Sequence, residues 1–125
     1  MNCTPAPHGV LFLCHTIKVK REVFMIRLEV TMGRNIPDAG TVSEAMFTDF
    51  VHLVIMPLLE FGTILDAVGF WKGQEEQTKI LYVEMPESEL AEMMPKFEHI
   101  ANEYKRMYRQ ESVLISQLQT NAIFK

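Results

Sequence analysis

Cysteine is scarce in this 125-residue chain, which has two, Cys3 and Cys14. Neither lies in a C-x-x-C motif or at a cysteine–histidine spacing typical of zinc ligands, so we expect no metal site. We expect no cofactor either. The sequence leaves two states open for these cysteines, a Cys3–Cys14 disulfide or a pair of free thiols.

The chain also lacks an excess of positive charge, because 12 Lys and Arg stand against 16 Asp and Glu, for a net charge of −4. Domains that bind nucleic acid usually present a basic face. The nearest feature is a short cluster at the expected end of a helix, where cations complement the helix dipole: Lys105, Arg106 and Arg109. We therefore expect no nucleic-acid partner.

No apolar run is long enough to span a bilayer. The longest candidate, Val10 to Ile17, is far shorter than the roughly 20 residues required. Its positive charges follow it, at Lys18 and Lys20, whereas a signal peptide carries them in front. We expect a cytoplasmic protein with no membrane partner. Residues 1–22 are interpreted as an arm or an extra strand, or as sequence upstream of a natural start at Met25, and residues 23–125 as one domain.

Catalytic signatures are missing as well. The sequence contains no G-x-S-x-G, phosphate-binding loop, G-x-G-x-x-G or H-E-x-x-H motif. No catalytic residue can be assigned on this basis, and whether the protein is an enzyme stays open.

What the sequence does contain is a clear order of elements. Val23 to Met32 alternates apolar and polar residues, which predicts a strand. Thr41 and Glu44 have the spacing of a capping box and predict the start of a helix that Pro57 kinks or ends. Residues 62–71 and 78–85 predict a hairpin whose turn is 72–76.

A second helix is expected from Pro86, with a kink or a break into two pieces at Pro95. Residues 112–118 predict a fourth strand, and the tail 121–125 offers one more pairing. The order strand–helix–strand–strand–helix–strand predicts an α+β, ferredoxin-like sandwich. Its four-stranded antiparallel sheet has the spatial order four, one, three, two, with both helices on one face.

Alternation assigns side chains to the two faces of this sheet. The floor under the helices is expected to be apolar: Phe24, Ile26, Leu28, Val30, Met32, Leu81, Val83 and Met85. The opposite, open face carries Arg27, Glu29, Tyr82 and Glu84 among apolar residues. Its area is roughly 400 Å². An exposed patch of this size that combines apolar and polar side chains usually contacts a ligand or another protein surface. Three interpretations stand: a dimer interface, a small-molecule pocket walled by a partner subunit, or a solvated face.

Four short strings carry a family resemblance: Gly33-Arg34, the segment from Asp66 to Gly73, Thr78-Lys79, and Tyr104 through Gln110-Glu111-Ser112-Val113. In this order and spacing the chain resembles an uncharacterised bacterial family, a domain of unknown function. Phe47 stands where that pattern usually has Trp, the hairpin turn is shorter, and an Arg-Phe-Pro run after Pro57 is absent. The resemblance implies domain boundaries but no activity.

Three functions follow as hypotheses. The first is a homo-oligomeric binding module for a small anionic or aromatic molecule, with Arg27 and Arg34 holding the anion and Trp71 or Tyr82 stacking. The second is an enzyme on a dimeric scaffold whose buried carboxylate, Asp66, Glu84 or Glu29, has a raised pKa. The third is a structural or partner-binding protein.

Three predictions make these hypotheses concrete. Arg27 is expected to pair with a carboxylate of the open face, Glu29, Asp66 or Glu84. The candidates Arg34, Asp66, Trp71 and Tyr82 are expected to converge, because topology brings the end of the first strand to the hairpin. The dimer is expected to form through the open face.

Overall fold

The computed structural model describes residues 22–125. The predictions for the preceding residues, an arm or extra strand and the state of Cys3 and Cys14, lie outside the described residues. The elements are β1 (Glu22–Gly33), α2 (Glu44–Phe50), η1 (Val51–Ile55), β2 (Thr63–Trp71), β3 (Gln74–Pro86), η2 (Glu87–Glu89), α3 (Leu90–Met107) and β4 (Leu114–Ile123).

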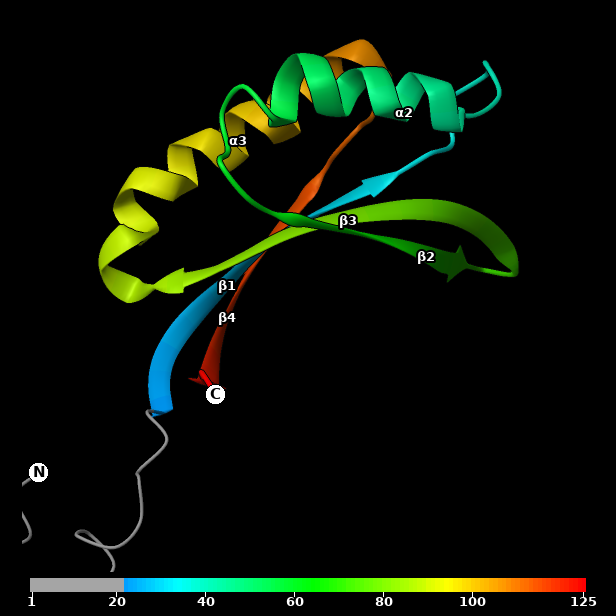
Figure 1. The fold of residues 1–125 in the computed structure, drawn as a ribbon. Coiled ribbons are helices and arrows are strands. Elements are labelled where there is room, and N and C mark those ends of the chain that lie inside the picture. The colour runs from blue at the N-terminus through cyan, green and yellow to red at the C-terminus, as the bar shows by residue number, and fades with distance from the viewer. Residues whose placement is uncertain (1–21) are drawn as a thin grey trace, which may run out of the picture.

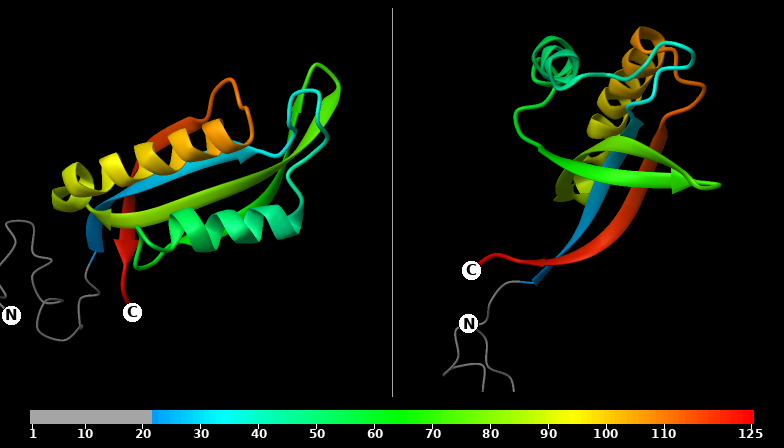
Figure 2. Two further views of the ribbon diagram at one scale, coloured as in Figure 1. Left: turned by 90° about the horizontal axis from the view of Figure 1, so that it is seen from above. Right: turned by 90° about the vertical axis from the view of Figure 1, so that its right-hand side faces the viewer.

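The four strands form one antiparallel sheet in the order β2-β3-β1-β4, and both helices lie on the same face of it (Figure 1). This is the predicted ferredoxin-like α+β arrangement. Figure 2 shows the two helices side by side over that face, with α3 packed on β1 and β4. None of the helices between residues 22 and 125 combines the length and apolar character that a bilayer crossing requires.

The core lies between this sheet face and the helices. Ile26, Leu28, Val30 and Met32 of β1 are buried there, as predicted, together with Leu81, Val83 and Met85 of β3. Above them, four rings from α2 and the end of α3 contact one another edge to face or tilted: Phe47, Phe50, Tyr104 and Tyr108. Full burial of one such ring contributes roughly 1.5–3 kcal/mol.

One predicted floor residue is placed differently. Phe24 is 79% exposed, because the pairing of β1 with β3 begins only at Met25. Before that point β1 pairs with β4 alone, and the two strands extend past the end of the sandwich. The alternation was correct, but the helices do not reach this end of the strand.

The first helix begins two residues later than the capping-box prediction implied. Ser43, not Thr41, is the N-cap, and its hydroxyl accepts a hydrogen bond from the Met46 amide. Glu44 is thereby free for other partners. After Phe50 the helix widens into one π-helical turn, in which the Met56 amide donates to the Val51 carbonyl, and it ends before Pro57 as predicted.

The hairpin turn is tighter than predicted. Lys72 and Gly73, both at positive φ (48° and 80°), are the only residues between β2 and β3. This is the backbone of a type I′ turn, whose twist matches that of the strands. Residues 74–76, predicted to be turn, therefore pair with β2 instead.

The second helix also departs from prediction. Pro86 ends β3, a 3₁₀ turn follows, and α3 then runs unbroken through Pro95. The two-piece alternative was wrong. β4 is longer than predicted, since its pairing with β1 continues to Ile123 opposite Glu22.

Candidate functional site

Five side chains of the open face form one connected cluster around Arg27 in the middle of β1: Arg27, Glu29, Tyr82, Glu84 and Thr120. Its guanidinium donates to Glu84 on β3 at 3.2 Å and approaches Glu29 at 3.5 Å. The same group lies over the ring of Tyr82, 3.6 Å from its centroid. Thr120 on β4 donates to the second oxygen of Glu84. The predicted pairing of Arg27 is therefore present.

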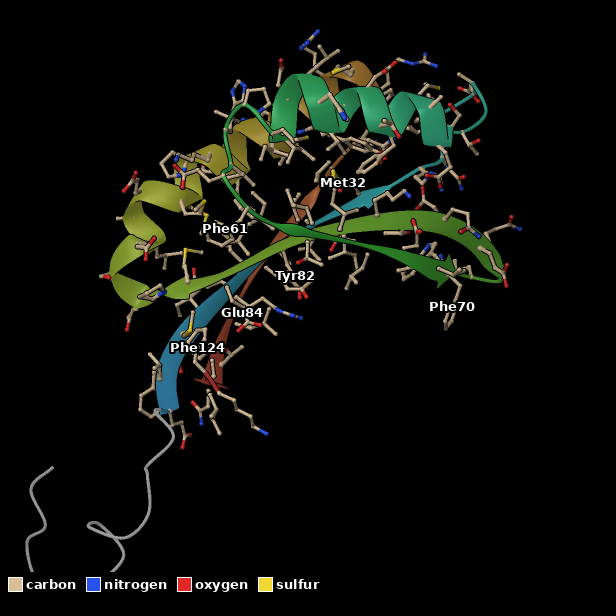
Figure 3. All side chains as sticks on the ribbon, in the orientation of Figure 1. Met32, Phe61, Phe70, Tyr82, Glu84 and Phe124 are labelled. Carbon is tan, nitrogen blue, oxygen red and sulfur yellow. The ribbon has the colours of Figure 1, made fainter. Side chains whose placement is uncertain are left out.

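The sheet register brings this cluster together. Arg27 is directly opposite Glu84, and Glu29 directly opposite Tyr82, so all four side chains share one face. Figure 3 shows Tyr82 and Glu84 on the side of the sheet away from the helices, and Met32 on the other side. Arg27, Glu29 and Glu84 are each between a fifth and a third exposed.

A hollow of about 300 Å³ lies beside the cluster, at the edge where β2 begins. Tyr82 and Glu84 form one wall, and Phe61, Gly62 and Thr63 form the other. The pairing of β2 with β3 stops at Thr63 and Tyr82, so no strand of the described residues 22–125 lies beside the last residues of β3 on that side.

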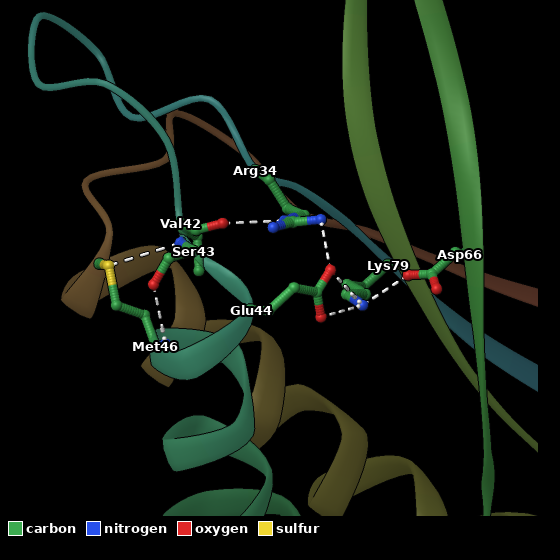
Figure 4. A network of polar contacts seen from close by, with 7 residues as sticks. All are labelled: Arg34, Val42, Ser43, Glu44, Met46, Asp66 and Lys79. Atoms are coloured by element: carbon green, nitrogen blue, oxygen red, sulfur yellow. Dashed lines mark hydrogen bonds and ion pairs between the residues drawn. The ribbon is translucent and has the colours of Figure 1, made fainter.

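A second network lies on the opposite face, between the sheet and the start of α2 (Figure 4). Lys79 of β3 donates to both oxygens of Glu44 at 3.1 and 2.9 Å, and to Asp66 of β2 at 2.5 Å. Arg34 donates to Glu44 and to the Val42 carbonyl, at 2.9 and 2.8 Å. The charges balance, with two cations and two carboxylates.

Burial in this network is uneven. The side chains of Lys79 and Arg34 are 6% and 13% exposed, whereas those of Asp66 and Glu44 are 74% and 68% exposed. Burial, the largest single influence, lowers the pKa of Lys79, but hydrogen bonds and charges from Asp66 and Glu44 outweigh it and leave that pKa raised. The Phe47 ring lies 5.3 Å from the ammonium.

Asp66 therefore differs from its sequence prediction. It is exposed, and the hydrogen bond and charge of Lys79 hold the pKa of its carboxyl below the ordinary value. It is neither a buried base nor a partner of Arg27, because its register opposite Lys79 puts it on the helix-facing side.

The expected convergence of four candidates is only partly present. Arg34 and Asp66 are joined through Lys79 and Glu44, and Tyr82 belongs to the cluster on the other face. Trp71 stands at the hairpin tip, 74% exposed, and the cation over its ring is Lys72 at 5.4 Å. Arg34 is engaged with Val42 and Glu44 instead.

Sequence reasoning missed Lys79 and Glu44 as partners, although one signal was present. Lys79 continues the apolar face formed by Leu81, Val83 and Met85, and a lysine on the buried face of a central strand requires a partner. Among residues 22–125, no group of three or more His, Cys, Asp or Glu side chains is placed to hold a metal ion.

A family model described as "Protein of unknown function (DUF3574)" matches residues 27–124. The chain belongs to the DUF3574 family. This confirms the resemblance to an uncharacterised family, and it covers every residue of both polar networks. No curated protein matches the chain.

Two solved structures share the fold of this DUF3574 domain. A phage SAM lyase in complex with S-methyl-5'-thioadenosine has a TM-score of 0.58 and 16% identity, covering 80% of this chain and 90% of that one. A phage SAM lyase in the apo state has a TM-score of 0.53 and 18% identity, covering 87% and 92%. At these sequence identities the similarity shows a shared fold only.

Several residues of the family pattern have structural roles in this DUF3574 chain. A Cβ on Gly33 would lie 2.6 Å from the Glu76 carboxylate, which accepts from the Asn35 amide. Gln110 donates to the Asn35 carbonyl and ties the end of α3 to the same loop.

Proposed function

We propose that this DUF3574 domain is a homo-oligomeric module that binds a small aromatic molecule on the open face of its sheet, beside Tyr82 and Glu84. The observation that carries the proposal is the hollow of about 300 Å³ with an aromatic ring and a carboxylate in one wall. This volume is at the lower end of the roughly 300–1,000 Å³ typical of ligand pockets.

The charges at the site favour a neutral or cationic ligand over an anion. Arg27 is the one cation of the cluster and is already bonded to Glu84 and close to Glu29. An anion would have to displace a carboxylate and would then meet two negative groups. Arg34, the other residue considered for anion binding, is bonded to Glu44 and to a backbone carbonyl.

The homo-oligomeric part of the proposal is supported by apolar side chains around the cluster. Leu65, Leu114 and Leu118 are 44%, 61% and 44% exposed, and the register places all three on the face of Arg27. A second copy covering them would also close the hollow on its open side, as in many ligand sites formed between subunits.

Titration of the ¹⁵N-labelled protein with S-methyl-5'-thioadenosine tests the proposal. This probe is a neutral nucleoside with a planar aromatic base, and the phage SAM lyase of similar fold is described in complex with it. We expect changes in amide chemical shift confined to Phe61, Thr63, Tyr82 and Glu84. Adenosine monophosphate, which carries a negatively charged phosphate, should bind more weakly. Tyr82→Leu should abolish the changes, while Glu98→Gln on the exposed side of α3 should not. Changes centred on Trp71 instead would contradict this site.

An enzymatic role is the second candidate, and the position of Glu84 favours it. Its carboxylate lines the hollow and is held by Arg27 and Thr120, as an oriented general base would be. Incubation with SAM, followed by mass spectrometry, tests this role. Turnover that is lost in Glu84→Gln but kept in Glu98→Gln would support it. Binding without turnover of SAM would leave the binding module as the better description.

A further inference from the structure

The outer edge of the sheet at β4 differs from ordinary edge strands. β4 is the terminal strand, so among residues 22–125 one row of its backbone donors and acceptors faces no other strand. From Leu114 to Phe124 it contains no charged residue, no proline and no glycine. Natural edge strands are usually protected by lysine, proline, bulges or short length. Here none of these protections applies over ten residues.

The other edge of the same sheet provides the contrast. β2 carries Asp66 in its middle, and that carboxylate is engaged with Lys79. Gly69 interrupts its side-chain rows. A charge and a glycine are common on strands that stay unpaired, so the two edges differ in how readily each accepts a further strand.

We propose that β4 pairs antiparallel with β4 of a second copy of this chain, which would join two sheets into one of eight strands. A strand is the partner that satisfies a row of backbone groups, and two identical edges related by a two-fold axis satisfy each other. The axis is perpendicular to the sheet, so like faces stay on the same side. A register centred on Leu118 places it opposite its own symmetry mate and pairs Leu114 with Ala122.

This edge contact is distinct from a face-to-face contact of the open faces, and side-chain direction separates the two. Leu118 shares the open face with Arg27, whereas Gln117 and Gln119 are opposite Leu28 and Ile26 and point to the helix-facing side. Both glutamines are exposed. Charges placed at the two glutamines therefore affect edge pairing and leave the open face unchanged.

The test is disulfide cross-linking of Leu118→Cys in the full chain with Cys3 and Cys14 replaced by serine. Opposite residues in an antiparallel pair have Cα atoms about 4.5–5.5 Å apart, within the range of a disulfide. The matched control is Val68→Cys, because Val68 is also exposed, at 55%, and lies on the other edge strand but outside the open face. It should form no cross-linked dimer. We expect a Leu118→Cys dimer to form.

A second pair of variants decides between edge and face. Gln117→Lys with Gln119→Lys should abolish the Leu118→Cys cross-link and shift the protein to a smaller species in sedimentation velocity, because lysines would meet across the two-fold axis. Val68→Lys, at an exposed position of β2, should change neither result. A cross-link that persists with both lysines present, or absence of the cross-link in the Leu118→Cys protein, overturns the proposal. Neither readout depends on a ligand, so the proposed binding site is tested separately.

Discussion

The hydroxyl of Tyr104, near the end of α3, donates a 2.7 Å hydrogen bond to the carbonyl of Gly33, the last residue of β1. Tyr104 is fully buried, and its ring contacts Phe47, Phe50 and Tyr108. One side chain thus connects a strand end, both helices and the loop that carries Arg34. The position of the second polar network depends on this connection.

Replacing Tyr104 with Phe should destabilise the protein by about 1–2 kcal/mol, because the ring is kept but the Gly33 carbonyl loses its donor. Urea denaturation followed by circular dichroism measures the change. Tyr82→Phe is the control, because the Tyr82 hydroxyl makes no hydrogen bond to any of residues 22–125, and its stability should lie within experimental error of the parent. Equal effects of the two variants would contradict the role assigned to the Tyr104 hydroxyl.

Stability should fall at alkaline pH. Burial raises the pKa of Tyr104 and that of Tyr108. A folded-state pKa above the unfolded value, about 10 for tyrosine, means that the unfolded chain loses its proton first as pH rises. The stability that the two protonated tyrosines contribute to the folded state is therefore complete below about pH 10 and is lost above it. The raised pKa of Lys79 acts in the same direction. Unfolding free energies measured from pH 9 upward should decline less steeply in Tyr104→Phe, and parallel curves would contradict the assignment.

The Arg27 cluster predicts an asymmetry between its members. Arg27→Met should change stability by less than about 1 kcal/mol, since the guanidinium and its two carboxylates are partly exposed and the carboxylates can be hydrated. Glu84→Gln should cost about 1 kcal/mol rather than the 3–5 kcal/mol of a fully buried pair, because Glu29 and the Tyr82 ring still face the charge. Thermal denaturation of both variants checks which one loses more stability. A larger loss of stability in Arg27→Met than in Glu84→Gln would contradict this prediction.

The Lys79 network predicts non-additive substitutions. Asp66→Asn and Glu44→Gln should each be mild, because the buried ammonium keeps one carboxylate in either case. Together they leave a buried cation without an anionic partner, so the double variant should lose more than the sum of the two. Acid titration adds a second readout. The lowered pKa of Asp66 contributes stability above its unfolded pKa, near 3.9, that disappears as pH falls through the folded value. Asp66→Asn should remove that part of the acid transition.

Periodicity located most of the fold. β1 differs from its prediction by one residue at each end, because ten alternating residues end at a glycine and a breaker-rich loop. Residues 74–76 were predicted as turn rather than strand because an exposed strand segment and a turn have the same polar composition. The π-helical turn at Val51–Ile55 has no composition signal, since its sequence also suits an α-helix.

The candidate site was predictable where it depended on register. Arg27, Tyr82 and Glu84 share a face by alternation alone, and they meet. Trp71 and Arg34 were grouped by topology, which brings strand ends together but does not fix where side chains point. Arg34 bonds to Val42 and Glu44 because Ser43, rather than Thr41, caps the helix.

The inward-facing ammonium of Lys79 also makes it a chemical reporter. Amine-acylating reagents require a free amine that solvent can reach, and this one is enclosed by Asp66, Glu44 and the Phe47 ring. Lys72, at the hairpin tip, should be acylated at once. Lys79 should be acylated only when β2, with Asp66, moves away from β3 and exposes the ammonium. The ratio of the two labelling rates would therefore record how often β2 opens in the native protein.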